Sequence, residues 1–411
     1  MTEKERTPGA YPWRARTAVL TLGTFVVGTD GFIIVGLLPE IRETLHVSAA
    51  AAGQLVSVFA LAYALLGPVL AAFTGRWPRR RVLVAGVALL AAGNAVTASA
   101  HVYGLVLASR VLAGSGAALF VASAVATAAH LAGERLRGSA IAMVTAGATL
   151  SLVLGAPLGT LVGGVWGWQT AMWFVAAVAG AVAVVLAVLL PPIRLEQGAA
   201  LRQRIAPLTD RRVLRILVVT LLAFIGIFLP FTYMSAVFAP AVGGEQARLA
   251  LLLLVFGVAA TAGNLTAGWL TDRYGPRRVV IGATVGVAAV FVVMLPIREV
   301  FVLVVIAEAL SGVVSYSVIG PQQHRIIAYA PAEGASLVTS LNTSTGYLGN
   351  FLASIIGAVI LTTTGSAVLL LPIAAAFAAF AAFLTWRLSR PRREGAGEGV
   401  GETGKPVTTA K

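Results

Sequence analysis

The sequence has no cysteine and only four histidines among its 411 residues, and charged side chains make up only 11% of it. Without cysteine the chain has no disulfide, no thiol nucleophile and no thiolate metal site. The histidines are scattered along the chain and give no metal-binding cluster: His46, His101, His130 and His324. An ordinary soluble domain carries about 25% charged residues. The scarcity of charge excludes an ordinary soluble domain. Because the chain lacks cysteine and its histidines are scattered, we expect no metal, and we also expect no organic cofactor.

Hydrophobic residues are abundant instead, at 58% of the chain with a mean hydropathy of +0.90. They gather in twelve stretches of about 18–25 residues, each long enough to cross roughly 30 Å of hydrocarbon as a helix. The sequence therefore predicts an all-α membrane protein. We place the spans near 18–38, 52–73, 82–99, 104–128, 139–163, 171–190, 216–238, 249–270, 279–297, 300–322, 336–361 and 366–388.

The 30 basic residues outnumber the 16 acidic ones and fall on one side of the predicted path. If the chain starts inside and crosses at each span, only Arg42, Arg110, Arg248 and Arg298 lie outside the inner segments. Cytoplasmic loops retain Lys and Arg, so we expect a multi-pass protein of a bacterial inner membrane with both termini in the cytoplasm. Nucleic-acid binding, the other reading of a net charge of +14, is disfavoured because the arginines are spread over every inner loop without interleaved aromatic residues. We expect them to contact anionic lipid instead.

The chain divides into two halves of six spans. We expect a cytoplasmic tail at 1–17, a six-helix bundle at 18–190, a cytoplasmic linker at 191–215, a second six-helix bundle at 216–388 and a cytoplasmic tail at 389–411. The linker carries six arginines. The last segment is rich in Gly and Thr, a composition typical of disorder.

The halves repeat at an offset of about 198 residues. The basic turn at 76–81 matches the turn at 273–278, and Arg110-Val-Leu-Ala-Gly114 aligns with Glu308-Ala-Leu-Ser-Gly312. Chance similarity among helices rich in Ala, Leu and Gly is the alternative. Two parallel six-helix repeats imply a central cavity between them and alternating access by rocking of the halves.

These features resemble the major facilitator superfamily: six plus six helices, basic turns after the second and eighth spans, and Arg-x-x-x-Gly-x-Gly in the fourth span at Arg110, Gly114 and Gly116. The runs from Gly28 to Pro39 and from Gly155 to Trp168 are similar to its proton-coupled drug-efflux branch, near the sugar-efflux and chloramphenicol-efflux permeases. The resemblance covers residues 18–388 and leaves the substrate open. It implies a secondary transporter driven by a proton gradient, and we expect it to be a monomer.

Three ionisable side chains lie well inside the predicted spans: Asp30, Arg110 and Glu308. Each is costly in hydrocarbon and is therefore expected to face the cavity or a partner. Asp30 and Arg110 differ in depth by about one helical turn, which permits a contact. Asp30 is our candidate for proton coupling, because burial favours its neutral form while a nearby Arg favours its charged form. The alternative for Asp30 is an acid that caps a helix break at Gly28 and Gly31 or that lies at the interface.

Arg110 does not give up its proton in proteins, so we assign it electrostatic gating. A buried pair that only fixes two helices is the other interpretation. Glu308 occupies the position of Arg110 in the second half, with no basic residue within a turn or two in the sequence. It either attracts cationic groups of a substrate, provides a second protonation site, or is a structural partner.

The basic turns resemble a gating motif of the family. The second copy is nearly complete, and its Asp is expected to accept hydrogen bonds from the N-terminus of a neighbouring helix and so hold the inner side shut. In the first copy Ala71 and Gly75 replace the family's Gly and Asp, so the acidic role is not carried over; simple positive-inside anchoring is the alternative for the arginines. The matching residues are Arg76, Arg79, Arg80, Gly268, Asp272, Arg273, Gly275 and Arg277.

Glycines in the fifth span recur at spacings of eight and four residues, with a proline among them: Gly147, Gly155, Pro157, Gly159 and Gly163. Glycines four apart share one helix face and permit close packing, and the proline adds a bend. The pattern resembles a loosened antiporter motif, although helix packing alone explains it equally well.

The predicted function is proton-coupled export of a small, largely apolar drug or antibiotic. A sugar or metabolite permease is the alternative, which the scarcity of polar residues inside the spans disfavours. A membrane-embedded enzyme or channel is disfavoured because the sequence shows no metal-binding cluster of His, Asp and Glu, no glycine-rich phosphate loop and no Ser/His pair with a supporting acid. Side chains that could line a drug pocket are Phe32, Asn94, Phe228, Tyr233, Met234, Tyr316, Gln322, Gln323, Asn342 and Asn350.

Overall fold

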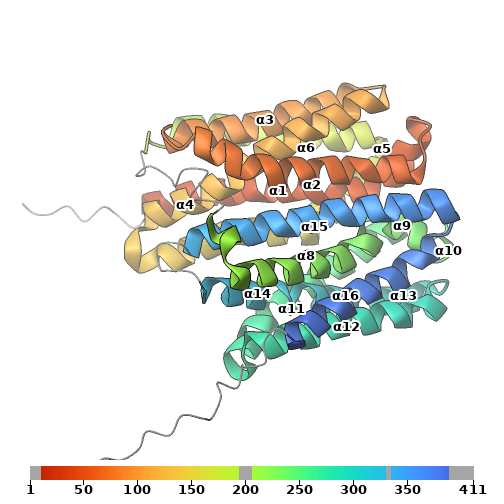
Figure 1. Ribbon diagram of the computed structural model, residues 1–411. Helices are drawn as coiled ribbons and strands as arrows, with labels where there is room; N and C mark the ends of the chain where they lie inside the picture. Colours follow the sequence, from red (N-terminus) through yellow and green to blue (C-terminus); the bar gives the residue numbers. More distant parts are fainter. Residues whose placement is uncertain (1–10, 194–205, 330–334, 388–411) are drawn as a thin grey trace, which may run out of the picture.

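The computed structural model describes residues 11–193, 206–329 and 335–387, and every regular element within them is helical (Figure 1). Twelve helical segments of this part are long and apolar enough to cross a membrane, which confirms the predicted architecture. The first half contains α1 (Tyr11–Thr44), α2 (Ala49–Phe73), α3 (Arg79–Ser99), α4 (Tyr103–Leu150), the π-helical segment η1 (Ser151–Gly155), α5 (Ala156–Trp166) and α6 (Trp168–Leu189).

The second half follows a short 3₁₀ turn, η2 (Ala206–Thr209). Its elements are α8 (Arg211–Thr232), α9 (Met234–Val237), α10 (Ala239–Val242), α11 (Gln246–Tyr274), α12 (Pro276–Ile297), α13 (Phe301–Tyr316), α14 (Ile319–Ile327), α15 (Ala335–Thr364), the 3₁₀ turn η4 (Ala367–Leu369) and α16 (Leu370–Arg387). We call the face at which α1 begins and α16 ends the terminal face, and the other face of the spans the opposite face.

Several predicted boundaries were displaced. Helices α1 and α8 begin before the predicted spans, at Tyr11 and Arg211, within the segments predicted as tail (1–17) and linker (191–215). The seventh span was placed at 216–238, but α8 ends at Thr232, two residues after Pro230, and the short helices α9 and α10 follow. The tenth span was placed at 300–322 and is interrupted after Tyr316. The predicted tail at 389–411 lies outside the described residues.

The fourth and fifth spans meet at Gly133. The chain changes direction there because Gly133 has φ of 70° and ψ of 174°, a conformation that side chains with a Cβ disfavour. The two membrane segments on either side are Tyr103–Gly133 and Arg135–Trp166. Glycine thus makes the turn within the stretch between the spans that were predicted at 104–128 and 139–163.

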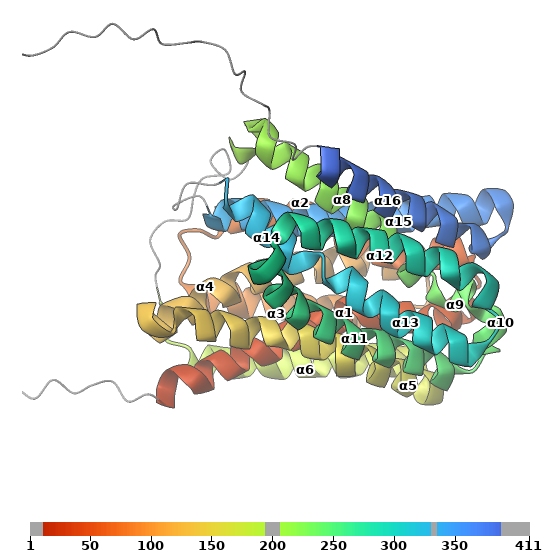
Figure 2. The same cartoon turned by 90° about the horizontal axis from the view of Figure 1, so that it is seen from below.

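The two halves form separate groups of helices in Figure 1, and in Figure 2, which is seen from below, helices of the second half such as α11 and α13 lie in front of those of the first half. In the first half α4 packs against α1, α2 and α3, and α3 also packs against α6; in the second half α11 packs against α13, and α8 against α15 and α16. Across the boundary α2 packs along α15, while α5 and η1 pack along α11. The boundary between the halves therefore has two long seams, one on each side of the centre.

Equivalent glycines pack against equivalent carbonyl groups in the two halves. Gly114 of α4 lies against the backbone oxygen of Phe59, and Gly312 of α13 lies against the backbone oxygen of Phe256. Neither contact leaves room for a Cβ atom. The alignment of Arg110 with Glu308, which lie one turn before these glycines, is therefore reproduced by the helix packing.

Candidate functional site

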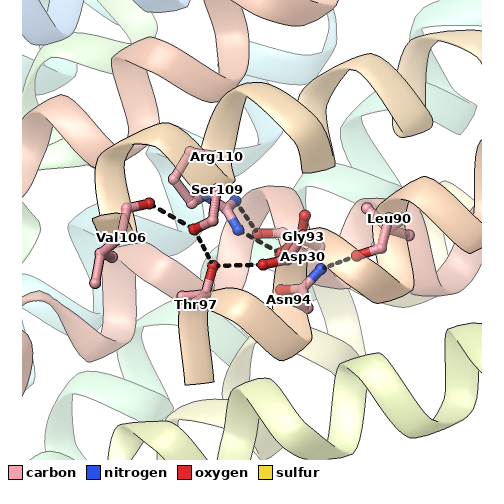
Figure 3. A network of polar contacts seen from close by, with 8 residues as sticks. All are labelled: Asp30, Leu90, Gly93, Asn94, Thr97, Val106, Ser109 and Arg110. Carbon is pink, nitrogen blue, oxygen red and sulfur yellow. Dashed lines mark hydrogen bonds and ion pairs between the residues drawn. The ribbon is translucent and has the colours of Figure 1, made fainter. Parts of the chain in front are cut away.

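Asp30 and Arg110 form a buried ion pair inside the first half (Figure 3). Nη1 of Arg110 lies 2.7 Å from Oδ1 of Asp30, and its Nη2 donates to the backbone oxygen of Asp30 at 3.2 Å. The side chains are 0% and 1% exposed for Asp30 and Arg110, respectively. The contact permitted by their depths is thus present, and the structure directs these two charges toward each other.

The pair leaves two polar atoms unused. Oδ2 of Asp30 and Nε of Arg110 are both buried without a hydrogen-bond partner among the described residues. Asn94 and Thr97 of α3 are drawn next to the pair in Figure 3, and Oδ1 of Asn94 is likewise buried and unpartnered. A carboxylate with one free oxygen in a region poor in hydrogen-bond donors can accept a proton there, so the geometry is compatible with a proton-binding role for Asp30.

Phe59 lies between the ion pair and a cavity at the boundary of the halves. The guanidinium carbon of Arg110 is 4.8 Å from the centre of the Phe59 ring, a cation–π contact. Phe59 also lines the cavity, together with side chains of both halves. The pair is therefore separated from the central cavity by the side chain of Phe59.

The central cavity has a volume of about 140 Å³ and is mostly aromatic and apolar. Four of the ten residues predicted to line a pocket do so: Phe32, Phe228, Tyr316 and Asn350. Sequence reasoning missed Phe59, Phe224 and Tyr347. For Phe59 a signal exists in the repeat, since Phe256 stands 197 residues later, at the same offset as that between Arg76 and Arg273.

The other predicted lining residues lie elsewhere. Tyr233 donates to the backbone oxygen of Ser354 at 2.8 Å in the seam between the halves. Asn342 accepts from Thr220 at 2.8 Å and donates to Gln323 at 2.8 Å, and Gln322 donates to Thr220 at 3.0 Å. These amides connect α8, α14 and α15 to one another instead of facing the central cavity.

Glu308 is buried on α13, with 4% of its surface exposed. It makes no hydrogen bond or ion pair within the described part of the chain, and it is not among the residues that line the central cavity. In the second half no Asp stands at the position that corresponds to Asp30, since equivalent glycine contacts align Thr21 with Leu221 and therefore Asp30 with Pro230. Glu308 is therefore unpaired within the described part of the chain, whereas Arg110, the residue aligned with it in the first half, is paired with Asp30.

Replacing Glu308 by Gln is expected to preserve folding, because Gln is similar in size to the neutral acid and keeps its polarity. If Glu308 takes up a proton during transport, the pH dependence of export changes in the variant; if it attracts cations, the range of exported compounds narrows. Export assayed over several substrates and pH values measures both effects. Identical profiles for the variant and the wild type would remove Glu308 from the mechanism.

The acidic residue of the second basic turn is exposed. Asp272 at the end of α11 has no hydrogen bond or ion pair with any described residue. The predicted bond to a neighbouring helix N-terminus is therefore not formed in this conformation. Gly275, which follows α11, has φ of 80° and allows the sharp turn into α12, while Gly268 has open space around it.

Three arginines of the two turns contact aromatic rings or backbone carbonyl groups. Arg273 lies over the rings of Trp269 and Tyr274, at 5.6 Å from each centre. Arg277 donates to the backbone oxygen of Trp386 at 2.9 Å. In the first turn the backbone N–H of Arg79 donates to Ile193 at 2.8 Å, Arg76 is exposed and Arg80 is partly buried. The gating role of these residues remains a prediction.

The glycine ladder packs α5 against α1. Gly155 lies against Thr29, Gly159 against Ile33 and Gly163 against Leu37, so two faces with the same four-residue period meet. Pro157 lies in the first turn of α5, directly after the π-helical segment η1. Proline cannot donate to the preceding turn, which accounts for the widened segment. Gly116 similarly packs α4 against the backbone of Gly86. The packing interpretation is confirmed, and an antiport-specific role is untested.

The halves are joined at the opposite face. Ser354 of α15 donates to the backbone oxygen of Gly53 at 2.8 Å, and Gln246 of α11 donates to the backbone oxygen of Gly36 at 2.7 Å. Toward the terminal face, a second cavity of about 190 Å³ lies between α2, α4 and α15. Tyr63 lines this cavity and stacks on Tyr347, which lines the central one, with ring centres 3.7 Å apart. The structure is thus closed at the opposite face and hollow toward the terminal face.

Known proteins share this sequence and fold. Residues 20–245 and 216–411 match the family model of the Major Facilitator Superfamily. An uncharacterized MFS-type transporter of Bacillus subtilis is 32% identical over 79% of this chain and 83% of its own length. A chloramphenicol resistance protein of Streptomyces lividans is 32% identical over 62% of this chain and 66% of its own length. A chloramphenicol efflux pump of Mycobacterium tuberculosis is 31% identical over 69% of this chain and 70% of its own length.

The nucleoside transporter NupG has the same fold, with a TM-score of 0.75 at 13% identity over 92% of this chain and 100% of that one. Its low identity limits the likeness to the fold. The family and the relatives are transporters, not enzymes. With twelve membrane-capable helices in two similar halves, the chain belongs to the Major Facilitator Superfamily and is a multi-pass membrane transporter.

Proposed function

We propose that the protein exports a small, largely apolar compound in exchange for protons by alternating access. The observation that carries this proposal is the aromatic cavity between the halves, with the buried Asp30–Arg110 pair directly behind its wall at Phe59. Two relatives are named for chloramphenicol resistance or efflux. A sugar site needs several polar groups to replace water around hydroxyls, and the described cavity wall offers one amide and the hydroxyl groups of Tyr316 and Tyr347.

The coupling step follows from the state of Asp30. When Oδ2 is unprotonated, the carboxylate is neutralised by Arg110; when it is protonated, Arg110 loses its counter-ion and its contact with Asp30 weakens. Arg110 also contacts Phe59, so its displacement alters the cavity wall. A substrate bound against Phe59 and a proton bound to Asp30 thereby favour different positions of Arg110, so the two compete. Such competition between substrate and proton is the requirement for antiport.

The orientation is part of the proposal. We infer that the terminal face is cytoplasmic, in a bacterial inner membrane, because it carries the basic turns. The structure then represents a state open to the inside, from which an exported compound is loaded. Protons, membrane lipids and the substrate are the partners, and a monomer has both halves needed for the cycle.

Expression in an efflux-deficient bacterium tests the proposal. The wild type is expected to raise the minimal inhibitory concentration of chloramphenicol or another apolar antibiotic by at least about fourfold, and Asp30→Asn is expected to abolish the increase, because the amide cannot release a proton. Drug accumulation in everted vesicles, measured with and without a protonophore, reports the coupling directly.

Immunoblots of membrane fractions serve as the control for expression of both proteins. Export by the wild type that persists after the pH gradient is collapsed contradicts proton coupling. Full resistance in Asp30→Asn cells contradicts the assignment of Asp30, even if export itself is confirmed.

A further inference from the structure

The wall of the central cavity carries aromatic rings that are suited to contact with an aromatic ligand. Phe32 meets the ring of Phe231 edge-on at 6.1 Å, and Phe228 meets the same ring edge-on at 5.7 Å. Phe224 stacks on Phe228 at 5.7 Å. Rings in such clusters present both faces and edges, which favour contact with a further aromatic ring. Since the wall combines α1 with α8, a ring bound there contacts both halves at once.

The same wall carries no charge. Among the described residues that line the cavity, none is Asp, Glu, Lys, Arg or His. Asp30 and Arg110 neutralise each other behind Phe59, and Glu308 lies outside the wall. A charged group brought into this space would lose its water without gaining a counter-ion, which is strongly unfavourable. The cavity is therefore matched to an uncharged compound.

Among the polar side chains of the wall, the Asn350 amide has both a hydrogen-bond donor and an acceptor that are unused. Asn350 of α15 lines the cavity, and neither its amide nitrogen nor its oxygen makes a hydrogen bond with a described residue; Oδ1 is fully buried. Asn342, two turns earlier on the same helix, uses both amide atoms in contacts with Thr220 and Gln323. Asn350 itself is half-buried, and a buried acceptor without a partner, as its Oδ1 is, is costly. An unpartnered amide at the wall of an aromatic cavity therefore indicates a position that a ligand completes.

We propose that Asn350 is the specificity-determining contact of this cavity and that the substrate is an uncharged aromatic compound bearing an amide or hydroxyl group. Such a group both donates and accepts, as the two ends of the Asn350 amide require. The inference rests on the proposed export function and adds the substrate class and the residue that selects it. Sites built to bond a polar group discriminate strongly against analogues that lack it.

Binding to the purified full-length chain in lipid nanodiscs tests the inference. Chloramphenicol serves as the uncharged aromatic amide, and tetraphenylphosphonium serves as an aromatic ion of permanent positive charge. The wild type is expected to bind chloramphenicol and to show at least tenfold weaker binding of tetraphenylphosphonium. Asn350→Leu, which has a similar volume, is expected to weaken chloramphenicol binding by about tenfold or more, equivalent to about 1.4 kcal/mol. Asn350→Gln keeps an amide and is expected to stay within about threefold of the wild type.

Asn342→Leu is the matched control on the same helix. It is expected to lower the unfolding temperature, because it removes partners of Thr220 and Gln323, and to leave the chloramphenicol affinity of the folded protein unchanged. If Asn350→Leu unfolds at the wild-type temperature and binds chloramphenicol equally well, the assignment of Asn350 is wrong while the proposed function stands. Equal binding of tetraphenylphosphonium by the wild type overturns the uncharged class. Absence of gradient-dependent export of any probe overturns the proposed function itself.

Discussion

Replacing Arg110 by Met is expected to destabilise the protein by about 3–5 kcal/mol and to abolish transport. The reason is that Asp30 stays fully buried while its counter-ion is removed, and an uncompensated buried charge costs that much. Unfolding in detergent micelles, followed by tryptophan fluorescence, measures the loss. Arg298→Met is the control: Arg298 pairs with Glu299 at the surface, at 3.0 Å, and exposed pairs contribute about 0–1 kcal/mol.

The double variant Asp30→Asn with Arg110→Met separates stability from coupling. Removing both charges eliminates the buried ion, so most of the stability lost in Arg110→Met is expected to return. Transport driven by the pH gradient is expected to remain absent, because no titratable group is left at the site. A double variant that regains both stability and gradient-driven export shows that the pair only fixes α1 to α4. One that stays as unstable as Arg110→Met contradicts the energetic account.

Replacing Gly257 by Val is expected to slow transport by about tenfold or more. Gly257 of α11 lies directly against the carbonyl group of Leu152 in η1, so a side chain there collides with backbone of the other half. Overpacking costs about 1–3 kcal/mol, and 1.4 kcal/mol is a tenfold change in a population. The conformation closed at the opposite face becomes rarer, and the cycle passes through it less often.

Transport rates in vesicles measure this effect at matched expression. Gly180→Val on α6 is the control, since a Cβ atom there meets nothing within 4 Å. An unchanged rate in Gly257→Val would mean that the seam between α11 and η1 is not rebuilt in each cycle. Loss of folded protein in both variants would instead reflect a general cost of valine in place of glycine in these helices.

The repeat and the positions of the ionisable residues could be predicted, whereas the helix ends near Pro230 and Tyr316 could not. Hydropathy alone continued the seventh and tenth spans through 238 and 322, because the residues beyond the breaks are also apolar. The breaks depend on where neighbouring helices hold Tyr233 and Ser317, through bonds to Ser354 and Gly263. Those partners are far away in the sequence.

The sequence by itself determined the number of spans, the division into halves and the membrane depth of Asp30 and Arg110. These follow from constraints along one dimension: a helix must be apolar over about 20 residues to cross hydrocarbon, and depth grows by a fixed rise per residue. Only the tertiary structure decided which way each helix is turned. It paired Asp30 with Arg110, put Phe59 over the pair and directed Asn350, not Asn94, into the cavity. The rotation of a helix about its axis depends on close packing between distant segments, since in lipid little hydrophobic drive distinguishes one apolar face from another.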